Sequence, residues 1–236
     1  MRFWSKAEPI DRISLPNAPE IFVVIRRTRQ AKRLSLRVSG LDGRTTLTAP
    51  PHIDDQELIT FVRDKEQWIL KHQGSLGHTQ VRIGAEILFH GVTVPIRQSL
   101  KRTANFEQDA IFAPAQRTAL HVRALLKERA RRQLVIECDQ FAARLGRRPQ
   151  RITLRDTRSR WGSCSSKGDL MFSWRLIMAP PRVLSYVAAH EVAHLKHMDH
   201  SKDFWACVHT IYGPYQNERD WLRKNGAALH QFDFED

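Results

Sequence analysis

The chain has 236 residues, 42% hydrophobic and 27% charged, an ordinary balance for a globular protein of one large domain or two small ones. Three cysteines without a CxxC pair argue against a disulfide framework, and no stretch approaches the roughly 18 apolar residues of a membrane-spanning helix. The first residues lack the apolar run of a signal peptide, so we expect a soluble cytoplasmic protein that is not bound to a membrane.

Lysine and arginine total 38 residues and aspartate and glutamate total 25, which gives a net charge of +13. Such a balance attracts polyanions. The arginine-rich segments at 26–37 and 129–132 could supply contacts to phosphates, so nucleic acid is a candidate partner. No basic stretch alternates with the aromatic residues that stack on single strands, and a basic protein with arginine-rich faces is the simpler interpretation.

The first part of the sequence is rich in strand patterns. Residues 1–20 carry three prolines and little periodicity, and they predict a loose arm. An apolar run at 21–25 and alternating apolar residues at 34–38 predict two strands. The turn signal at 41–44 indicates that the runs beside it form a hairpin.

A helix is expected next, from residue 54 or 55 to about residue 71, with an aspartate as its cap. Residues 81–97 predict two more short strands. The longest helical pattern covers residues 118–145, and Gly146 stands where a helix of this length would end.

The last part of the sequence alternates strands with a polar loop and then turns helical. Residues 152–154 and 170–174 predict strands on either side of the loop SRWGSCSSKGD. Two prolines begin a helix over 180–195, and two more helices are expected near 201–211 and 215–224.

This order of elements indicates an α+β fold. We place a division near residue 115, which separates a β-rich N-terminal region with one helix at 1–115 from a second domain at 116–236. The second domain carries the residues with the strongest chemical signal.

That signal is an HExxH motif on the predicted helix at 180–195. Residues four apart lie on one helix face, so His190 and His194 can hold a single ion. Glu191 lies about 100° round the helix from His190, which leaves it beside the ion rather than on it. From there it can take a proton from water that the metal activates.

Catalytic zinc usually has three protein ligands and one open position. The side chain of His197 would lie one turn beyond the ion on a continued helix. His200 can reach the ion only if the chain turns back first, and Asp199 before it tolerates the left-handed backbone conformation. These considerations favour His200, while Asp199 itself and Glu218 remain alternatives, with Glu218 as the main rival.

Several strings in the sequence form a recognisable set: RWGSCSSKG at 160–168, RL at 175–176, HEVAH at 190–194, HS at 200–201 and FW at 204–205. RR at 26–27, KRLSLRV at 32–38 and WL at 221–222 belong to the same set. Together they resemble the YgjP-like metallopeptidase family, a bacterial group related to the WLM and SprT-like zinc proteases. The resemblance covers about residues 20–225.

The resemblance implies a zincin-like core, in which a long helix backs a small sheet and the HExxH helix lies beneath that sheet, followed by C-terminal helices. It also implies that the strand at 170–174 lies at a sheet edge, where an extended peptide could add to it. It implies Zn²⁺ on His190, His194 and His200, with Glu191 as the catalytic base of a metallopeptidase that acts on polypeptides. Ser173 and Ser185 depart from the asparagine and aspartate found in many members.

Two other functions compete with peptide hydrolysis. Some relatives carry a nucleotide pyrophosphatase label, and Arg158, Arg160 and Arg175 near the polar loop could bind the phosphates of UTP. Three imidazoles favour zinc over magnesium, however, and the chain has no GxxxxGK[ST] loop. The other competitor is a nucleic-acid-associated protein, either a binder or a protease that acts on DNA-bound protein. A metal site without catalysis is a further alternative, which the intact Glu191 disfavours.

Other polar residues are weaker candidates for the site. Cys164 lacks an evident partner base, so a packing role is favoured over a nucleophilic one. For the group that stabilises the oxyanion, Tyr212, Tyr215 and His197 are the candidates.

Overall fold

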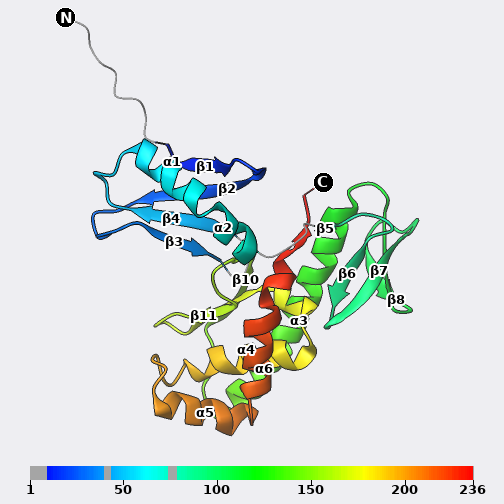
Figure 1. The fold of residues 1–236 in the computed structure, drawn as a ribbon. Helices are drawn as coiled ribbons and strands as arrows, with labels where there is room; N and C mark the ends of the chain where they lie inside the picture. Colours follow the sequence, from blue (N-terminus) through cyan, green and yellow to red (C-terminus); the bar gives the residue numbers. More distant parts are fainter. Residues whose placement is uncertain (1–9, 40–43, 74–78, 236) are drawn as a thin grey trace, which may run out of the picture. The chain divides into compact units, whose positions relative to one another are not determined.

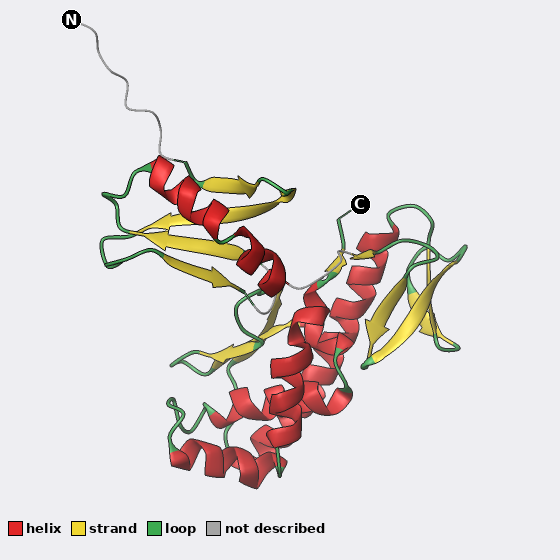
Figure 2. Ribbon diagram, in the orientation of Figure 1, coloured by secondary structure: helices red, strands yellow, loops and turns green. Residues whose placement is uncertain are grey.

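The computed structural model in Figure 1 describes residues 10–39, 44–73 and 79–235. The chain divides into two compact units, Met1–Leu76 and Gly77–Asp236. Both units mix helices with strands, as Figure 2 shows, and the predicted α+β class is confirmed in this general form. Among the described helices, none combines the length and the apolar character needed to cross a membrane.

The first unit is a four-stranded sheet with two helices. Its elements are β1 (Arg12–Leu15), β2 (Ala18–Arg27), β3 (Ser35–Val38), β4 (Thr45–Ala49), α1 (Asp55–Asp64) and α2 (Glu66–Gln73). The strand order is β1-β2-β4-β3, and the pairing is antiparallel except between β2 and β4. Apolar side chains from the strands and from both helices form one core: Ile13, Leu15, Ala18, Val23, Leu47, Ala49, Leu58, Val62 and Ile69.

Two predictions for the first unit need correction. The arm predicted at 1–20 contains a strand, because Ile13 and Leu15 are buried when β1 pairs with β2. The single predicted helix is two helices that meet at Lys65, and Asp54 caps the first by accepting a hydrogen bond from the Glu57 amide at 2.7 Å. β3 and β4 pair antiparallel, as the predicted hairpin requires, while residues 41–43 of the turn predicted at 41–44 lie outside the described residues.

The second unit contains the following strands: β5 (Thr79–Gln80), β6 (Glu86–Phe89), β7 (Val92–Gln98), β8 (Asn105–Glu107), β9 (Ala110–Ala113), β10 (Arg151–Arg155), β11 (Gly162–Cys164), β12 (Asp169–Ser173) and β13 (Phe232–Asp233). Its α-helices are α3 (Thr118–Leu145), α4 (Pro181–Ala193), α5 (Lys202–Tyr212) and α6 (Gln216–Asn225). Two short 3-10 helices, η1 (Trp174–Met178) and η2 (Gly226–His230), complete it.

Helix α3 is the central helix of the second unit, against which several of its other elements pack. It has the predicted limits, and Gly146 ends it in the left-handed conformation with φ of 70°. Its buried side chains recur every three or four residues, and they include Val122, Leu126, Leu134 and Phe141. This face packs against η1, α4 and α5, so the helix predicted to carry the HExxH motif lies on a rigid support.

Strands β6 to β9 form a second sheet in the order β6-β7-β9-β8, and it shares a core with α3. The turn between β6 and β7 is bonded to η1, the element before α4: the amides of His90 and Gly91 donate to the carbonyls of Ile177 and Met178, each at 2.9 Å. Because this sheet belongs to the second unit, the compact units divide at residue 76, about 40 residues before the division that we expected at 115.

The small sheet beside α4 has the order β10-β12-β11. β10 runs parallel to β12, and β11 runs antiparallel to it. The predicted strand at 170–174 is therefore the central strand, so the expectation that it receives a peptide at its edge is wrong. Within the described residues the edge on that side is β11, which arises inside the loop that the sequence predicted as irregular.

Candidate metal and catalytic site

The HExxH residues lie at the end of α4. Pro181 occupies the first turn of this helix, where its missing N–H costs nothing. The α-helix ends at Ala193, and His194 is its C-cap residue. His190 and His194 therefore stand on the last turn, with the apolar residues of the helix buried on the other faces.

His200 joins these two histidines. One ring nitrogen from each of the three side chains lies within 4.8 Å of the other two, a spacing that could hold a metal ion. The Nε2 atoms of His190 and His200 are 3.1 Å apart. His190 and His194 come from α4, and His200 comes from the segment that leads into α5.

The chain turns back before His200, as a third ligand at this position requires. Asp199 is not in the left-handed conformation that we expected. Its carboxylate instead accepts a hydrogen bond from the amide of Ser201 at 3.3 Å. The hydroxyl of Ser201 then caps α5 by accepting from the amide of Phe204 at 3.4 Å.

The neighbours of the three imidazoles fix how their rings are oriented. Nδ1 of His194 lies 2.9 Å from the carbonyl oxygen of His197, which leaves its Nε2 free to face the other rings. Phe204 packs against all three rings, with centroids 4.4 Å from His194 and 4.9 Å from both His190 and His200. The sequence marked Phe204 only as part of a family string, since nothing in its spacing shows that it would touch three histidines.

Burial decides the charge state of two of these rings. Burial, together with the charges of His194, His200 and Arg219, lowers the pKa of His190 to about 3. Burial also lowers the pKa of His194, although its hydrogen bond to the carbonyl of His197 acts in the opposite direction. These two imidazoles are therefore neutral at pH 7, which is the form that binds a metal ion.

Glu191 is buried beside the histidines, with 5% of its surface exposed. Burial raises the pKa of its carboxyl group to about 8, against the opposing effect of the Arg160 charge. The carboxyl group packs against the backbone of Gly162 in β11. Glu191 is thus held between α4 and the edge strand β11.

These groups open into one pocket, which we call the histidine pocket, of about 460 Å³. Its lining residues are Ser159, Arg160, Gly162, Ser163, Cys164, His190, Glu191, His194, Met198 and His200. The pocket brings together the three residues of the motif and His200, and it adds the whole of β11 to them.

The rival ligands lie elsewhere. Glu218 on α6 is buried, and one of its carboxylate oxygens lies 3.2 Å from Nε of Arg182. Neither Glu218 nor Asp199 belongs to a group of potential ligands within the described part of the chain. The side chain of His197 is also outside the cluster, and only its carbonyl takes part.

The other candidates separate into two groups. Cys164 lines the histidine pocket, but burial, together with the charges of Glu191 and Asp169, raises the pKa of its thiol to about 11. The thiol is therefore protonated at neutral pH and unsuited to act as a nucleophile. Tyr212, Tyr215 and His197 do not line this pocket, whereas Arg160 does.

Arg175, one of the three arginines considered for phosphate binding, is structural. Its guanidinium is buried and bonds to both oxygens of Asp156, at 2.7 and 3.2 Å. It also donates to the carbonyls of Leu229 and Phe232, at 3.0 and 3.2 Å. Arg175 thus attaches the C-terminal segment to the unit and is not available to a ligand.

Comparison with known proteins gives a family match. The model of the YgjP-like metallopeptidase domain matches residues 32–225, a range that includes the three histidines and Glu191. No curated protein matches the chain. Among solved structures, the metallopeptidase zymogen of Pyrococcus abyssi abylysin is similar to 39% of this chain and 93% of its own, with 18% sequence identity and a TM-score of 0.36.

Proposed function

The chain belongs to the YgjP-like metallopeptidase family and is a metallohydrolase, and we propose that it cleaves peptide bonds with a zinc ion on His190, His194 and His200 and with Glu191 as the general base. The fold around this site is proposed to be zincin-like, with α3 as the backing helix and α4 as the active helix. The observation that carries the proposal is the approach of three imidazole nitrogens to within 4.8 Å of one another beside a buried glutamate.

The donor set fits zinc. Imidazole nitrogens suit zinc, whereas magnesium prefers oxygen ligands. The carbonyl of His197 holds the His194 ring so that Nε2 is the free ligand atom, an arrangement typical of metal-binding histidines. Three protein ligands also leave a fourth position for substrate and water, as catalytic zinc sites require.

The chemistry divides between the ion and the protein. When bound, zinc polarises the substrate carbonyl, makes water more acidic, and by its positive charge lowers the pKa that burial raises to about 8 in Glu191, so that this carboxyl group is ionised. Glu191 accepts a proton from the attacking water and later passes it to the leaving amine. The close packing against Gly162 limits where the glutamate carboxyl group can lie, and the protonated thiol of Cys164 takes no part in proton transfer.

Substrate binding is assigned to β11. This strand lies at the edge of its sheet and lines the histidine pocket with Gly162, Ser163 and Cys164. An extended polypeptide can add to such an edge through backbone hydrogen bonds, which need no particular side chains. Arg160, two residues before the strand, places a positive charge at the same pocket, where it can stabilise the negative oxygen that forms during hydrolysis.

The competing functions have less support. Arg175 is bonded within the protein interior, so Arg158 and Arg160 are the two arginines near the loop that remain as candidate phosphate ligands. For nucleic acid, part of the positive charge on α3 is compensated locally, because Glu128 pairs with both Arg129 and Arg132. A nucleic-acid partner stays a prediction from the net charge.

The test compares two substrates. Purified protein loaded with zinc is incubated with unfolded casein and, separately, with UTP, beside the variant Glu191→Gln. We expect casein cleavage that Glu191→Gln slows by about 100- to 10,000-fold, the usual contribution of a general base, with an unchanged zinc content. Release of pyrophosphate from UTP that depends on Glu191, without casein cleavage, would overturn the proposal.

A further inference from the structure

A second pocket lies directly beside the histidine pocket. It measures about 510 Å³, and its lining residues are Arg147, Arg148, Ser165, Ser166, Lys167, Gly168, His194, Leu195, Lys196 and Met198. His194 and Met198 line both pockets, so the two are neighbours that share a wall. We call the second one the basic pocket.

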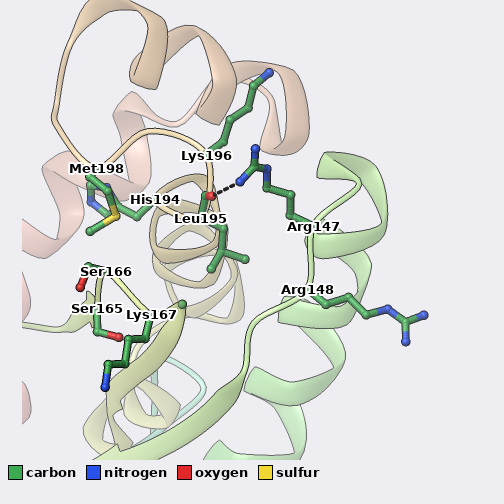
Figure 3. Close-up of a pocket in the computed structure, with 10 residues that line it drawn as sticks. Arg147, Arg148, Ser165, Ser166, Lys167, His194, Leu195, Lys196 and Met198 are labelled. Carbon is green, nitrogen blue, oxygen red and sulfur yellow. Dashed lines mark hydrogen bonds between the residues drawn. The ribbon is translucent and has the colours of Figure 1, made fainter.

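The walls of the basic pocket come from three segments (Figure 3). Arg147 and Arg148 follow the end of α3, Lys167 lies in the turn between β11 and β12, and Lys196 follows α4. These four residues are positively charged at neutral pH, and no aspartate or glutamate is among the described residues of the lining. An anion inside this pocket would meet positive charge from all three segments.

The local structure holds the guanidinium of Arg147 and the backbone of Lys167 in place. One guanidinium nitrogen of Arg147 donates to the carbonyl oxygen of Leu195 at 3.1 Å, as the dashed line in Figure 3 shows. Lys167 sits in a tight turn, closed by a hydrogen bond of 2.9 Å from the amide of Gly168 to the carbonyl of Ser165. Arg148 and Lys196 extend outward in Figure 3, and their flexible stems allow them to move onto a ligand.

The edge strand connects the two pockets. β11 lines the histidine pocket with Gly162, Ser163 and Cys164, and the chain continues directly into Ser165 and Lys167 of the basic pocket. A polypeptide paired with β11 would therefore run from the three histidines toward the four cations. The side chain that follows the residues paired with β11, or the end of the polypeptide, would then lie among those charges.

We propose that the basic pocket is a subsite for a carboxylate of the substrate, either the side chain of an aspartate or glutamate near the scissile bond or the terminal carboxylate of the polypeptide. This inference rests on the proposed function, since it names the substrate class of the same site. It makes the enzyme selective for acidic segments, although binding along β11 is by itself indifferent to side chains. Carboxylates suit arginine and lysine because each can donate charged hydrogen bonds to them.

The first experiment measures cleavage of matched fluorogenic peptides. One set differs only by glutamate, glutamine or lysine at the positions flanking the cleaved bond, and the other differs only by a free or an amidated C-terminus. We expect kcat/KM about tenfold higher for the carboxylate in one of the two sets, and that set identifies the source. The preference should shrink in about 1 M salt, which screens charges beyond about 3 Å.

The matched variants are Lys167→Glu with Lys196→Glu in the pocket and Lys127→Glu on the exposed face of α3. Reversing the pocket charges should lower the ratio of acidic to neutral kcat/KM about tenfold, whereas Lys127→Glu should leave the wild-type ratio. A second readout is binding: Glu191→Gln with zinc is titrated with labelled acidic and neutral peptides, and the acidic peptide should bind more tightly.

The outcomes separate the two proposals. Equal kcat/KM and equal binding for acidic, neutral, free and amidated peptides would overturn the carboxylate subsite and leave the peptidase intact. Tighter binding of UTP than of any peptide, lost when the pocket charges are reversed, would assign the basic pocket to phosphates and overturn the subsite together with the proposed substrate.

Discussion

Gly162 and Glu191 lie so close together that no side chain fits between them. A Cβ atom on Gly162 would be 2.5 Å from Oε1 and 2.6 Å from Cγ of Glu191. Gly162 does not have a positive φ, so the requirement for glycine here comes from this close approach. The edge strand and the general base are therefore packed as one unit.

Replacing Gly162 by alanine should displace the carboxyl group of Glu191 without touching a histidine. We expect kcat to fall about 100-fold, since a displacement of about 1 Å can cost that much, with zinc content unchanged. The control is the same substitution in the Glu191→Gln background, where there is no base left to displace. If Gly162→Ala lowers activity as strongly there, the contact is not the cause.

The ligand set predicts which variants lose the metal. His200→Ala should lose most of its zinc, as measured on purified protein by elemental analysis. His197→Ala should retain zinc, because it keeps the backbone carbonyl that accepts the hydrogen bond from His194. Glu218→Gln should also retain zinc, and loss of metal from this variant together with retention in His200→Ala would assign the third ligand to Glu218.

Zinc should also stabilise the fold. An ion that binds only the folded chain adds stability that grows with its concentration, by about 2.7 kcal/mol at 100 times its Kd. We expect zinc to raise the Tm of the chelator-treated wild type and of His197→Ala, but to have little effect on His200→Ala. Equal shifts in all three proteins would mean that zinc binds elsewhere.

The pair of Arg175 and Asp156 predicts a pH-dependent stability. Burial alone would raise the pKa of Asp156, but the hydrogen bond and the charge of Arg175 outweigh it, and the pKa lies below 3.8. A carboxyl group with a lowered pKa stabilises the fold above its unfolded pKa, and this contribution is lost as the pH falls through the folded value.

Asp156→Asn should therefore cost about 1 kcal/mol at pH 7, a modest value because the Asp156 side chain is 44% exposed. Urea unfolding from pH 7 down to about pH 3 should show the difference from wild type shrinking below pH 4. A cost that stays constant over this range would mean that the charge of Asp156 is not involved.

Cys164 gives a prediction about inhibitors. Because the pKa of its thiol is raised to about 11, alkylating reagents at pH 7 should modify it slowly and leave activity intact at first. Cys164→Ala should keep most of the wild-type activity. A loss comparable to that of Glu191→Gln would give the thiol a direct part in the reaction.

The sequence predicted those parts of the fold whose pattern is long or local. α3 and its end at Gly146 followed from a helical period kept over many turns. The approach of His190 and His194 followed from helix geometry alone. The family was also identified from its strings, and the match over residues 32–225 confirms it.

Features that depend on distant contacts could not be predicted in this way. β11 has only three small residues, which show no alternation, and its pairing with β12 depends on residues up to ten positions away. The position of β12 at the centre of its sheet depends on its pairing with β10, in which each residue of β10 pairs with the residue 18 positions later in β12. The contact of Phe204 with three histidine rings arises only when α5 packs back against α4.

The shortness of β11 affects the size of the products that we expect. Three residues of strand can pair with only a few residues of a polypeptide, and those residues must be extended and accessible. A folded domain already uses its backbone hydrogen bonds internally, so it cannot pair with β11. Cuts would then fall in exposed linkers and in chains that have lost their fold. On a multidomain protein the result would be a few large fragments, visible as discrete bands, rather than a mixture of short peptides.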